Sequence, residues 1–293
     1  MDLLEEKQDS WFRDQQALRI TALPLIGVEG EAETLVDRVI EAAEILYKDS
    51  SSFSKKECFT GPIRFVVASL LISLGDDAHS FLQAMDEVFD LLGKADMQSY
   101  WYQTDSDWNT ALILRMSKHL EPVTPEDIER LKSIYEEMKK RHWWLTGSED
   151  KPFAALLSML SDLDSAQIGV RTDEIYNGLK EAIGAGLTKL DSLQTASHIL
   201  CLSPLEAERA IELFQSYHSR FKTDEGLWIH SGDYDDLAML CLADQDPQAI
   251  ATRVMEYRKA FLSGFWGPSH DEAFSLACTL ALVETLRESE STK

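Results

Sequence analysis

The sequence has few residues that form disulfides or interrupt helices. Its 293 residues include only 4 cysteines and 8 prolines. The cysteines, Cys58, Cys201, Cys241 and Cys278, are far apart and form no CxxC pair, and three of them fall inside apolar helical runs. We interpret them as small buried hydrophobic residues in a reducing compartment, so the sequence gives no sign of a disulfide-stapled protein.

Positive charge is also scarce. The chain has 28 Lys and Arg residues against 51 Asp and Glu residues, which gives a net charge of −23. Nucleic-acid proteins need clustered cations to displace counterions, so we expect no nucleic-acid partner. The acid excess is explained by a solvated, self-repelling surface, and a basic partner protein is the alternative.

Long apolar runs are missing as well. The first residues, Met1–Lys7, are acidic where a secretory signal is basic and then apolar. The longest apolar stretches, around Phe65–Leu74 and Ala273–Val283, fall well short of the roughly 18 residues that cross a bilayer. We therefore expect a soluble, cytoplasmic protein with no membrane partner.

What the chain does contain is helical periodicity. Apolar residues recur at spacings of three and four residues, and there is no sustained alternation of apolar and polar residues. This pattern predicts an all-α fold. Six short apolar runs each begin with an alanine that a leucine follows within four residues: Ala68, Ala111, Ala155, Ala196, Ala238 and Ala277. Their separations are 43, 44, 41, 42 and 39 residues. This spacing predicts a helical hairpin of about 40 residues repeated six times.

Capping residues support the same repeat. Three predicted second helices begin with an N-cap residue and a proline: Thr124-Pro125, Ser203-Pro204 and Asp246-Pro247. Left-handed glycine caps are predicted at the ends of second helices, at Gly186, Gly226 and Gly264. Hydroxyl and carboxylate caps precede first helices: Ser148–Asp150, Ser231–Asp233 and Ser269–Asp271.

The two helices of a hairpin differ in kind. First helices such as Ala154–Leu160, Leu237–Ala243 and Phe274–Val283 are apolar on most sides and should be surrounded by other helices, whereas second helices are amphipathic. The hairpins would form an α/α toroid or a curved superhelix over residues 59–293. Two further helical segments in residues 1–58, Asp2–Arg19 and Glu31–Lys48, would cap this array.

Two stretches resemble known families. Trp144–Leu157, with Ser197–Leu200 downstream, resembles a bacterial family of uncharacterised helical proteins. That resemblance implies a helical fold and no activity. Gly226-Leu227-Trp228, followed by Ser231, Asp233 and the run Leu237–Leu240, resembles the repeats of prenyltransferase β subunits and terpene cyclases, which are α/α toroids. The metal-ligand pattern of Asp, Cys and His in that family is missing here.

Candidate ligand-binding residues cluster in the segments that enter first helices, where six of the seven tryptophans lie. Aromatic walls with convergent polar groups suit a small-molecule or sugar-like ligand. The ligand-binding candidates are Trp101, Asp107, Trp143, Trp228, His230, Trp266 and His270. In the structural alternative, the tryptophans hold each loop against the next hairpin and the aspartates only cap helices.

Carboxylate pairs could act as general acid and base, and the weak catalytic candidates are Asp150, Asp233 and Asp271. His230 with Asp233 and His270 with Asp271 do not form a recognised metal-binding spacing, so we expect no metal and no cofactor. His198, inside a first helix, is interpreted as a core residue.

These features favour a binding or scaffold module for an unknown protein or small-molecule ligand, with recognition on the Trp-rich edge or the inner concave surface. The alternative is a toroid-type enzyme that acts on an isoprenoid-like or carbohydrate-like substrate. An enzyme is the less favoured alternative, because the sequence has no GxSxG, no glycine-rich phosphate loop and no catalytic Cys and His pattern.

Overall fold

The computed structural model describes residues 20–50, 59, 61, 63–98, 104–141, 145–184, 189–224, 227–263 and 269–291. Within these ranges the chain is helical and contains no strand, so the predicted all-α class is confirmed. The chain divides into two compact units, Met1–Glu129 (unit 1) and Arg130–Lys293 (unit 2). None of the described helices is by itself long and apolar enough to span a bilayer.

The described residues of unit 1 include the short 3₁₀ helix η1 (Leu23–Leu25) and the α-helices α3 (Ala32–Asp49), α5 (Ile63–Leu74), α6 (Ala78–Lys94) and α7 (Asp105–Ser117). Helix α3 packs on α5 and α6, and α6 packs on α7. Trp108 of α7 is buried and lies edge-on to Phe59 and Phe89, with ring centroids 4.8 and 5.4 Å away. Helix α8 (Pro125–Arg141) begins in unit 1 and continues into unit 2.

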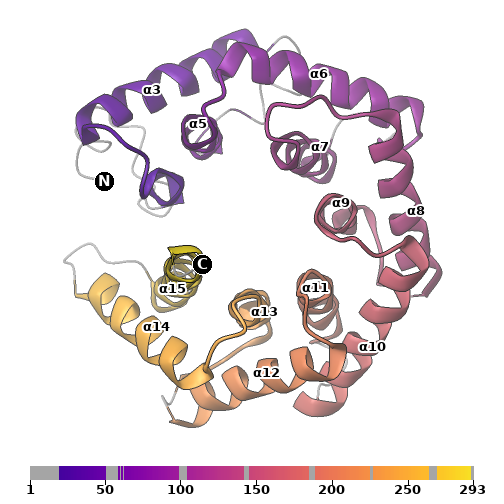
Figure 1. Ribbon diagram of the computed structural model, residues 1–293, viewed down its shortest axis with the longest axis vertical. Helices are drawn as coiled ribbons and strands as arrows, with labels where there is room; N and C mark the ends of the chain where they lie inside the picture. The colour runs from indigo at the N-terminus through magenta and orange to yellow at the C-terminus, as the bar shows by residue number, and fades with distance from the viewer. Residues whose placement is uncertain are drawn as a thin grey trace. The chain divides into compact units, whose positions relative to one another are not determined.

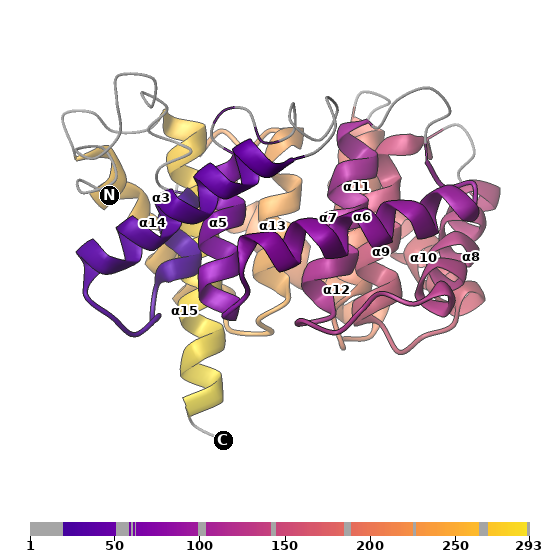
Figure 2. The same cartoon turned by 90° about the horizontal axis from the view of Figure 1, so that it is seen from above.

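Unit 2 consists of two layers of helices (Figures 1 and 2). One layer holds α9 (Lys151–Leu160), α11 (Leu190–Cys201), α13 (Tyr234–Cys241) and α15 (His270–Ser291). The other holds α10 (Ser165–Ile183), α12 (Ala207–Ser219) and α14 (Pro247–Leu262). Neighbours in each layer touch in chain order, and α10, α12 and α14 pack on α11, α13 and α15 respectively. Short helical segments lie beside them: the 3₁₀ helices η2 (Ser148–Asp150) and η5 (Ser231–Asp233) precede α9 and α13, and the π-helix η4 (Arg220–Asp224) follows α12.

The sequence explains why unit 2 has these layers. In α11 eight residues are buried, including every position of Ala196–Cys201, so the helix is covered on most sides. In α12 the buried residues recur at three and four and mark one face: Ala207, Ala210, Leu213, Phe214 and Tyr217. The contrast between apolar and amphipathic helices is therefore found as predicted for this pair, because only an enclosed helix tolerates apolar residues all round.

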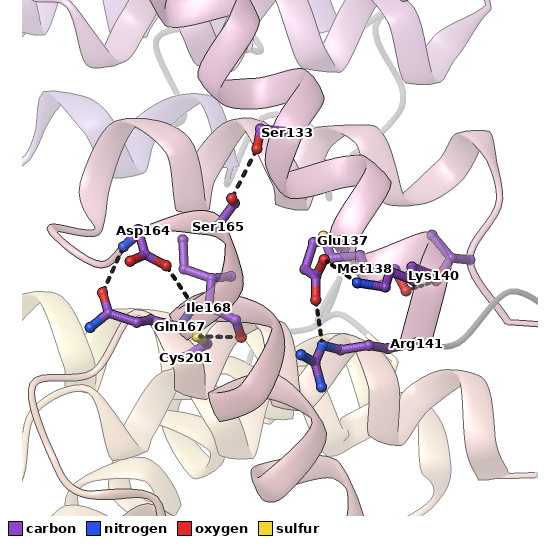
Figure 3. Close-up of polar contacts among 11 residues, drawn as sticks. Ser133, Glu137, Met138, Lys140, Arg141, Asp164, Ser165, Gln167, Ile168 and Cys201 are labelled. Carbon is purple, nitrogen blue, oxygen red and sulfur yellow. Dashed lines mark hydrogen bonds and ion pairs between the residues drawn. The ribbon is translucent and has the colours of Figure 1, made fainter.

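Contacts across α10 are close. A Cβ atom added at Gly169 would lie 2.6 Å from Cγ of Glu137 and from Nε of Arg141 on α8, so a larger residue here would force these side chains to move. In the same helix as Gly169, the Ser165 hydroxyl accepts a hydrogen bond from the Ser133 hydroxyl of α8 at 2.9 Å. The Cys201 thiol of α11 lies 4.0 Å from the Ile168 carbonyl (Figure 3). The three described cysteines are buried, as predicted, and Cys58 lies outside the described residues.

The predicted helix starts are mostly confirmed. Thr124 accepts a hydrogen bond from the Asp127 N–H at 3.3 Å, and Asp246 accepts one from the Ala249 N–H at 3.3 Å. The predicted start at Ser203-Pro204 is wrong, because α12 begins at Ala207.

The three predicted glycine caps at helix ends are not tested by the described residues. Left-handed glycines end two described helices, Gly75 after α5 with φ 71° and Gly184 after α10 with φ 63°. The predicted caps Gly186, Gly226 and Gly264 lie outside the described residues. Helix α15 runs to Ser291, well beyond the predicted end at Val283.

Candidate functional site

A pocket of about 260 Å³ lies in unit 2, between the segment that precedes α13, the last turns of α14 and the first turn of α15. Its lining residues are Leu227, Trp228, Ile229, His230, Asp233, Arg258, His270, Asp271 and Phe274. We call it the Trp228 pocket. It brings together five of the residues that the sequence singled out, namely Trp228, His230, Asp233, His270 and Asp271.

Two aromatic side chains line the pocket, one buried and one exposed. Phe274 is buried and lies edge-on to Phe221, with ring centroids 5.1 Å apart. Trp228 is 83% exposed, and its ring centroid lies 6.4 Å from that of His230. A tryptophan buries a large area when it finds a partner, so a water-exposed indole beside a pocket offers a stacking face to a ligand.

Asp233 is committed to the protein itself. Its Oδ2 atom accepts a hydrogen bond from the backbone N–H of His230 at 2.7 Å and lies 3.0 Å from the Nδ1 atom of the same residue. The first contact caps η5 at its N-terminus, where a carboxylate is favoured. The second orients the imidazole, since a carboxylate partner at Nδ1 leaves Nε2 available to a ligand. Asp233 is therefore a positioning residue for His230.

Arg258 and His270 form the other polar edge. The Arg258 guanidinium can only donate, so its Nη2 atom donates to Nδ1 of His270 at 3.0 Å. In the tautomer that fits this contact, Nδ1 of His270 is the acceptor and the Nε2–H is a donor. The pocket thus offers donors from Arg258 and His270 and acceptors from His230 and Asp271. With one cation and two carboxylates, no single charge sign dominates it, and it suits a polar ligand more than a strongly charged one.

The third catalytic candidate, Asp150, lies elsewhere in unit 2. Its Oδ2 atom accepts from the Gly147 N–H at 2.9 Å, and its Oδ1 atom faces Nδ1 of buried His198 at 3.8 Å. Burial raises the pKa of Asp150 to about 6, and the charges of Glu149 and Asp191 add to the effect. Asp150 does not line the Trp228 pocket, so this pocket collects two of the three candidate carboxylates.

Asp107, in unit 1, caps the start of α7, as the alternative in which the aspartates only cap helices predicts. It is buried, and its Oδ2 atom accepts from the Thr104 N–H at 3.0 Å while its own N–H donates to the Thr104 hydroxyl at 3.3 Å. Trp101, Trp143 and Trp266 lie outside the described residues. Among the residues that the structure describes, no three potential ligands are grouped in a way that could hold a metal ion.

The sequence did not mark Arg258 as part of the site, nor Asp236, which does not line the pocket, as a buried acid beside it. Arg258 lies on an amphipathic helix, where an arginine is ordinary, and only the packing of α14 on α15 turns it to His270. Asp236, three residues after Asp233, is buried and accepts from the Ser275 hydroxyl of α15 at 3.0 Å. Burial raises its pKa to about 7, and the neighbouring charge of Asp235 contributes. A run of three acids near a helix start was the only signal for it.

Known proteins give a family and no activity. The family model described as "Protein of unknown function (DUF4003)" matches residues 5–289. The "Uncharacterized protein YeaA" of Bacillus subtilis (strain 168) is 28% identical over 238 residues, which cover 77% of this chain and 65% of that protein. This chain thus spans less than two thirds of that relative's length. No solved structure matches.

Proposed function

The chain belongs to this family of proteins of unknown function, and we propose that it is a binding module that holds the ring of a small, carbohydrate-like ligand against Trp228. The observation that carries the proposal is the 83% exposure of the Trp228 indole beside a pocket lined with hydrogen-bond donors and acceptors. The apolar face of a sugar ring stacks on an indole, while its hydroxyl groups both donate and accept.

The size of the pocket separates the two ligand classes that the sequence suggested. Its volume of about 260 Å³ lies just below the roughly 300–1,000 Å³ of pockets for drug-sized ligands. One ring fits such a volume, and a long isoprenoid chain does not. The two histidines and Arg258 would also leave polar groups unpaired against an isoprenoid, which costs binding free energy.

The carboxylates favour binding over glycoside hydrolysis. Cleavage of a glycosidic bond by the usual mechanism uses two carboxyl groups, one as acid and one as base or nucleophile. Asp233 already accepts from His230 and caps η5, so Asp271 is the one pocket carboxylate left for chemistry. The enzyme alternative therefore receives less support than the binding module.

We also propose that the hairpins are tandem repeats of one array, a toroid or a curved superhelix, with the helical pair in residues 1–58 as its cap. Equivalent contacts at the repeat distance support this. Arg130 donates to the Ser158, Ser161 and Leu163 carbonyls, and Arg171, 41 residues later, donates to the Ser203 and Leu205 carbonyls. The Ser161 and Ser203 hydroxyls, 42 residues apart, each accept from the N–H two residues on, at 3.3 and 3.2 Å.

Calorimetric titration of the full chain with glucose, galactose, mannose and N-acetylglucosamine tests the binding proposal. We expect at least one sugar to bind, and Trp228→Ala to weaken that binding at least tenfold because the stacking face is removed. A matched control is Leu160→Ala, which also removes an exposed apolar side chain, in α9 and outside the pocket. Absence of binding by all four sugars, or equal affinity in Trp228→Ala and the wild type, would overturn the proposal.

A further inference from the structure

Unit 1 has a pocket of its own, of about 510 Å³, which the sequence analysis did not anticipate. It lies between the α5–α6 connection, one face of α6 and the segment that follows α7. Its charged lining residues are Asp76, Asp77, Glu87, Arg115 and Glu121. Their chemistry is distinct from that of the Trp228 pocket, because an arginine here lies almost fully buried among carboxylates.

Arg115 is the unusual member of this pocket. Its side chain is only 5% exposed, and its Nη2 atom donates to Oδ2 of the equally buried Asp76 at 2.5 Å. Its Nε–H is buried and has no hydrogen-bond partner among the described residues. A buried donor without an acceptor destabilises the fold. Arg115 nevertheless lines the pocket, and a carboxylate is the ligand group that best matches the geometry of a guanidinium.

Two of the four carboxylates already have full sets of partners. Asp76 accepts from Arg115 and from the Asp77 N–H at 2.9 Å. Asp77 caps α6 by accepting from the His79 and Ser80 N–H groups at 2.9 and 3.1 Å and from the Ser80 hydroxyl at 2.6 Å. These bonds lower the pKa of Asp77, the largest effect coming from the Ser80 hydroxyl. Neither residue needs a ligand.

The other two carboxylates are free to receive one. Glu87 is exposed and has a single long contact, 3.4 Å from the Gln83 amide. Glu121 is exposed and makes no side-chain hydrogen bond or ion pair with the described part of the chain. Two unneutralised carboxylates on one pocket attract an ammonium group. Leu120, which is 57% exposed, adds an apolar surface to the same pocket.

We propose that this pocket binds a small aliphatic amino acid, with its carboxylate toward Arg115, its ammonium group toward Glu87 and Glu121, and its side chain against Leu120. The buried Arg115–Asp76 pair is electrically neutral, so the guanidinium contributes mainly hydrogen-bond donors. The two glutamates then leave the pocket negative, which matches the ammonium end of the zwitterion. Either half of such a ligand alone would satisfy only one end of the pocket.

Titration calorimetry with L-leucine and two truncated analogues tests the proposal in the full chain. 3-Methylbutylamine lacks the carboxylate of leucine, and 4-methylpentanoate lacks its ammonium group. We expect leucine to bind at least tenfold more tightly than either analogue. A result in which leucine does not bind, or in which the amine binds as tightly as leucine, would overturn the amino acid assignment.

Variants of the lining residues test whether leucine binds in this pocket. Glu87→Gln with Glu121→Gln should reduce the affinity for leucine at least tenfold without unfolding the chain, since both side chains are exposed. Glu129→Gln, an equally exposed change on α8 outside the pocket, should leave it unchanged. Equal losses in both proteins would contradict the assignment. The site belongs to unit 1, so its failure would not affect the proposal for the Trp228 pocket in unit 2.

Discussion

Asp150 and Asp233 show how one capping position can serve different surroundings. Each accepts from the backbone N–H three residues earlier, at 2.9 and 2.7 Å. Beyond the cap, Asp150 faces the buried ring of His198, whereas Asp233 holds the half-exposed ring of His230 at a pocket. The same local geometry therefore lies against a buried histidine in one place and at the candidate pocket in the other.

Asp236 should make the stability of the protein depend on pH. Its pKa is raised from 3.8 to about 7, so the folded state holds the proton more tightly than the unfolded state. The stability from this group is complete below about pH 4 and is lost as the pH rises through about 7. Asp236→Asn keeps an acceptor for the Ser275 hydroxyl and removes the charge, so we expect it to be more stable than the wild type at pH 8, by roughly 1–3 kcal/mol.

Urea denaturation at pH 5 and pH 8 measures this effect. The advantage of Asp236→Asn should be smaller at pH 5 than at pH 8. Asp90→Asn, an exposed change on α6, serves as the control and should follow the wild type at both values. If Asp236→Asn and the wild type lost the same stability between pH 5 and pH 8, the buried charge of Asp236 would not be the cause.

Sequence patterns predicted single residues well where the chemistry is local. The hydroxyl and carboxylate caps at Thr124 and Asp246 depend on residues within three positions, so they could be found without a structure. The contacts of Asp236 with Ser275 and of Arg115 with Asp76 join residues 39 positions apart. No local pattern marks such pairs, because helix packing decides them.

At the level of elements, the misplaced start of α12 has a clear cause. Ser203-Pro204 has the composition of an N-cap followed by a first-turn proline. The Ser203 hydroxyl instead accepts from the Leu205 N–H at 3.2 Å and closes a local turn, which delays α12 to Ala207. Arg171 of α10 donates to the Ser203 and Leu205 carbonyls and so fixes this turn against α10. A serine side chain can satisfy a turn or a helix start, and the arginine favours the turn.

The two arginine contacts give a test of the proposed repeat. If Arg130 and Arg171 are equivalent, Arg130→Ala and Arg171→Ala should each lower the free energy of unfolding by roughly 1–3 kcal/mol, because each leaves carbonyl groups without their charged donor. Arg209→Ala, in which the side chain is 52% exposed, should change it little. Chemical denaturation measures all three variants. A loss in one of the two arginine variants and none in the other would contradict their equivalence.

At the level of the whole molecule, the periodicity of the sequence predicted the helical class but not the assembly of the helices. The 3.6-residue pattern tells which face of a helix is apolar. It does not tell which neighbour covers that face, since many helices present similar leucine and alanine surfaces. The Trp228 pocket is an example. Its loop residues were singled out from the sequence, whereas Arg258 and Phe274 line it because α14 packs on α15.

Nuclear magnetic resonance of the tryptophan indoles is the most direct test of the central claim that Trp228 receives a sugar ring. The full chain would be labelled with ¹⁵N in its 7 tryptophans and titrated with the sugar that binds most tightly. Trp228→Phe assigns the Trp228 signal, and buried Trp108 provides an internal control. We predict that the Trp228 indole N–H shifts in a saturable way while that of Trp108 does not. A Trp228 signal that stays in place under saturating sugar would contradict the account.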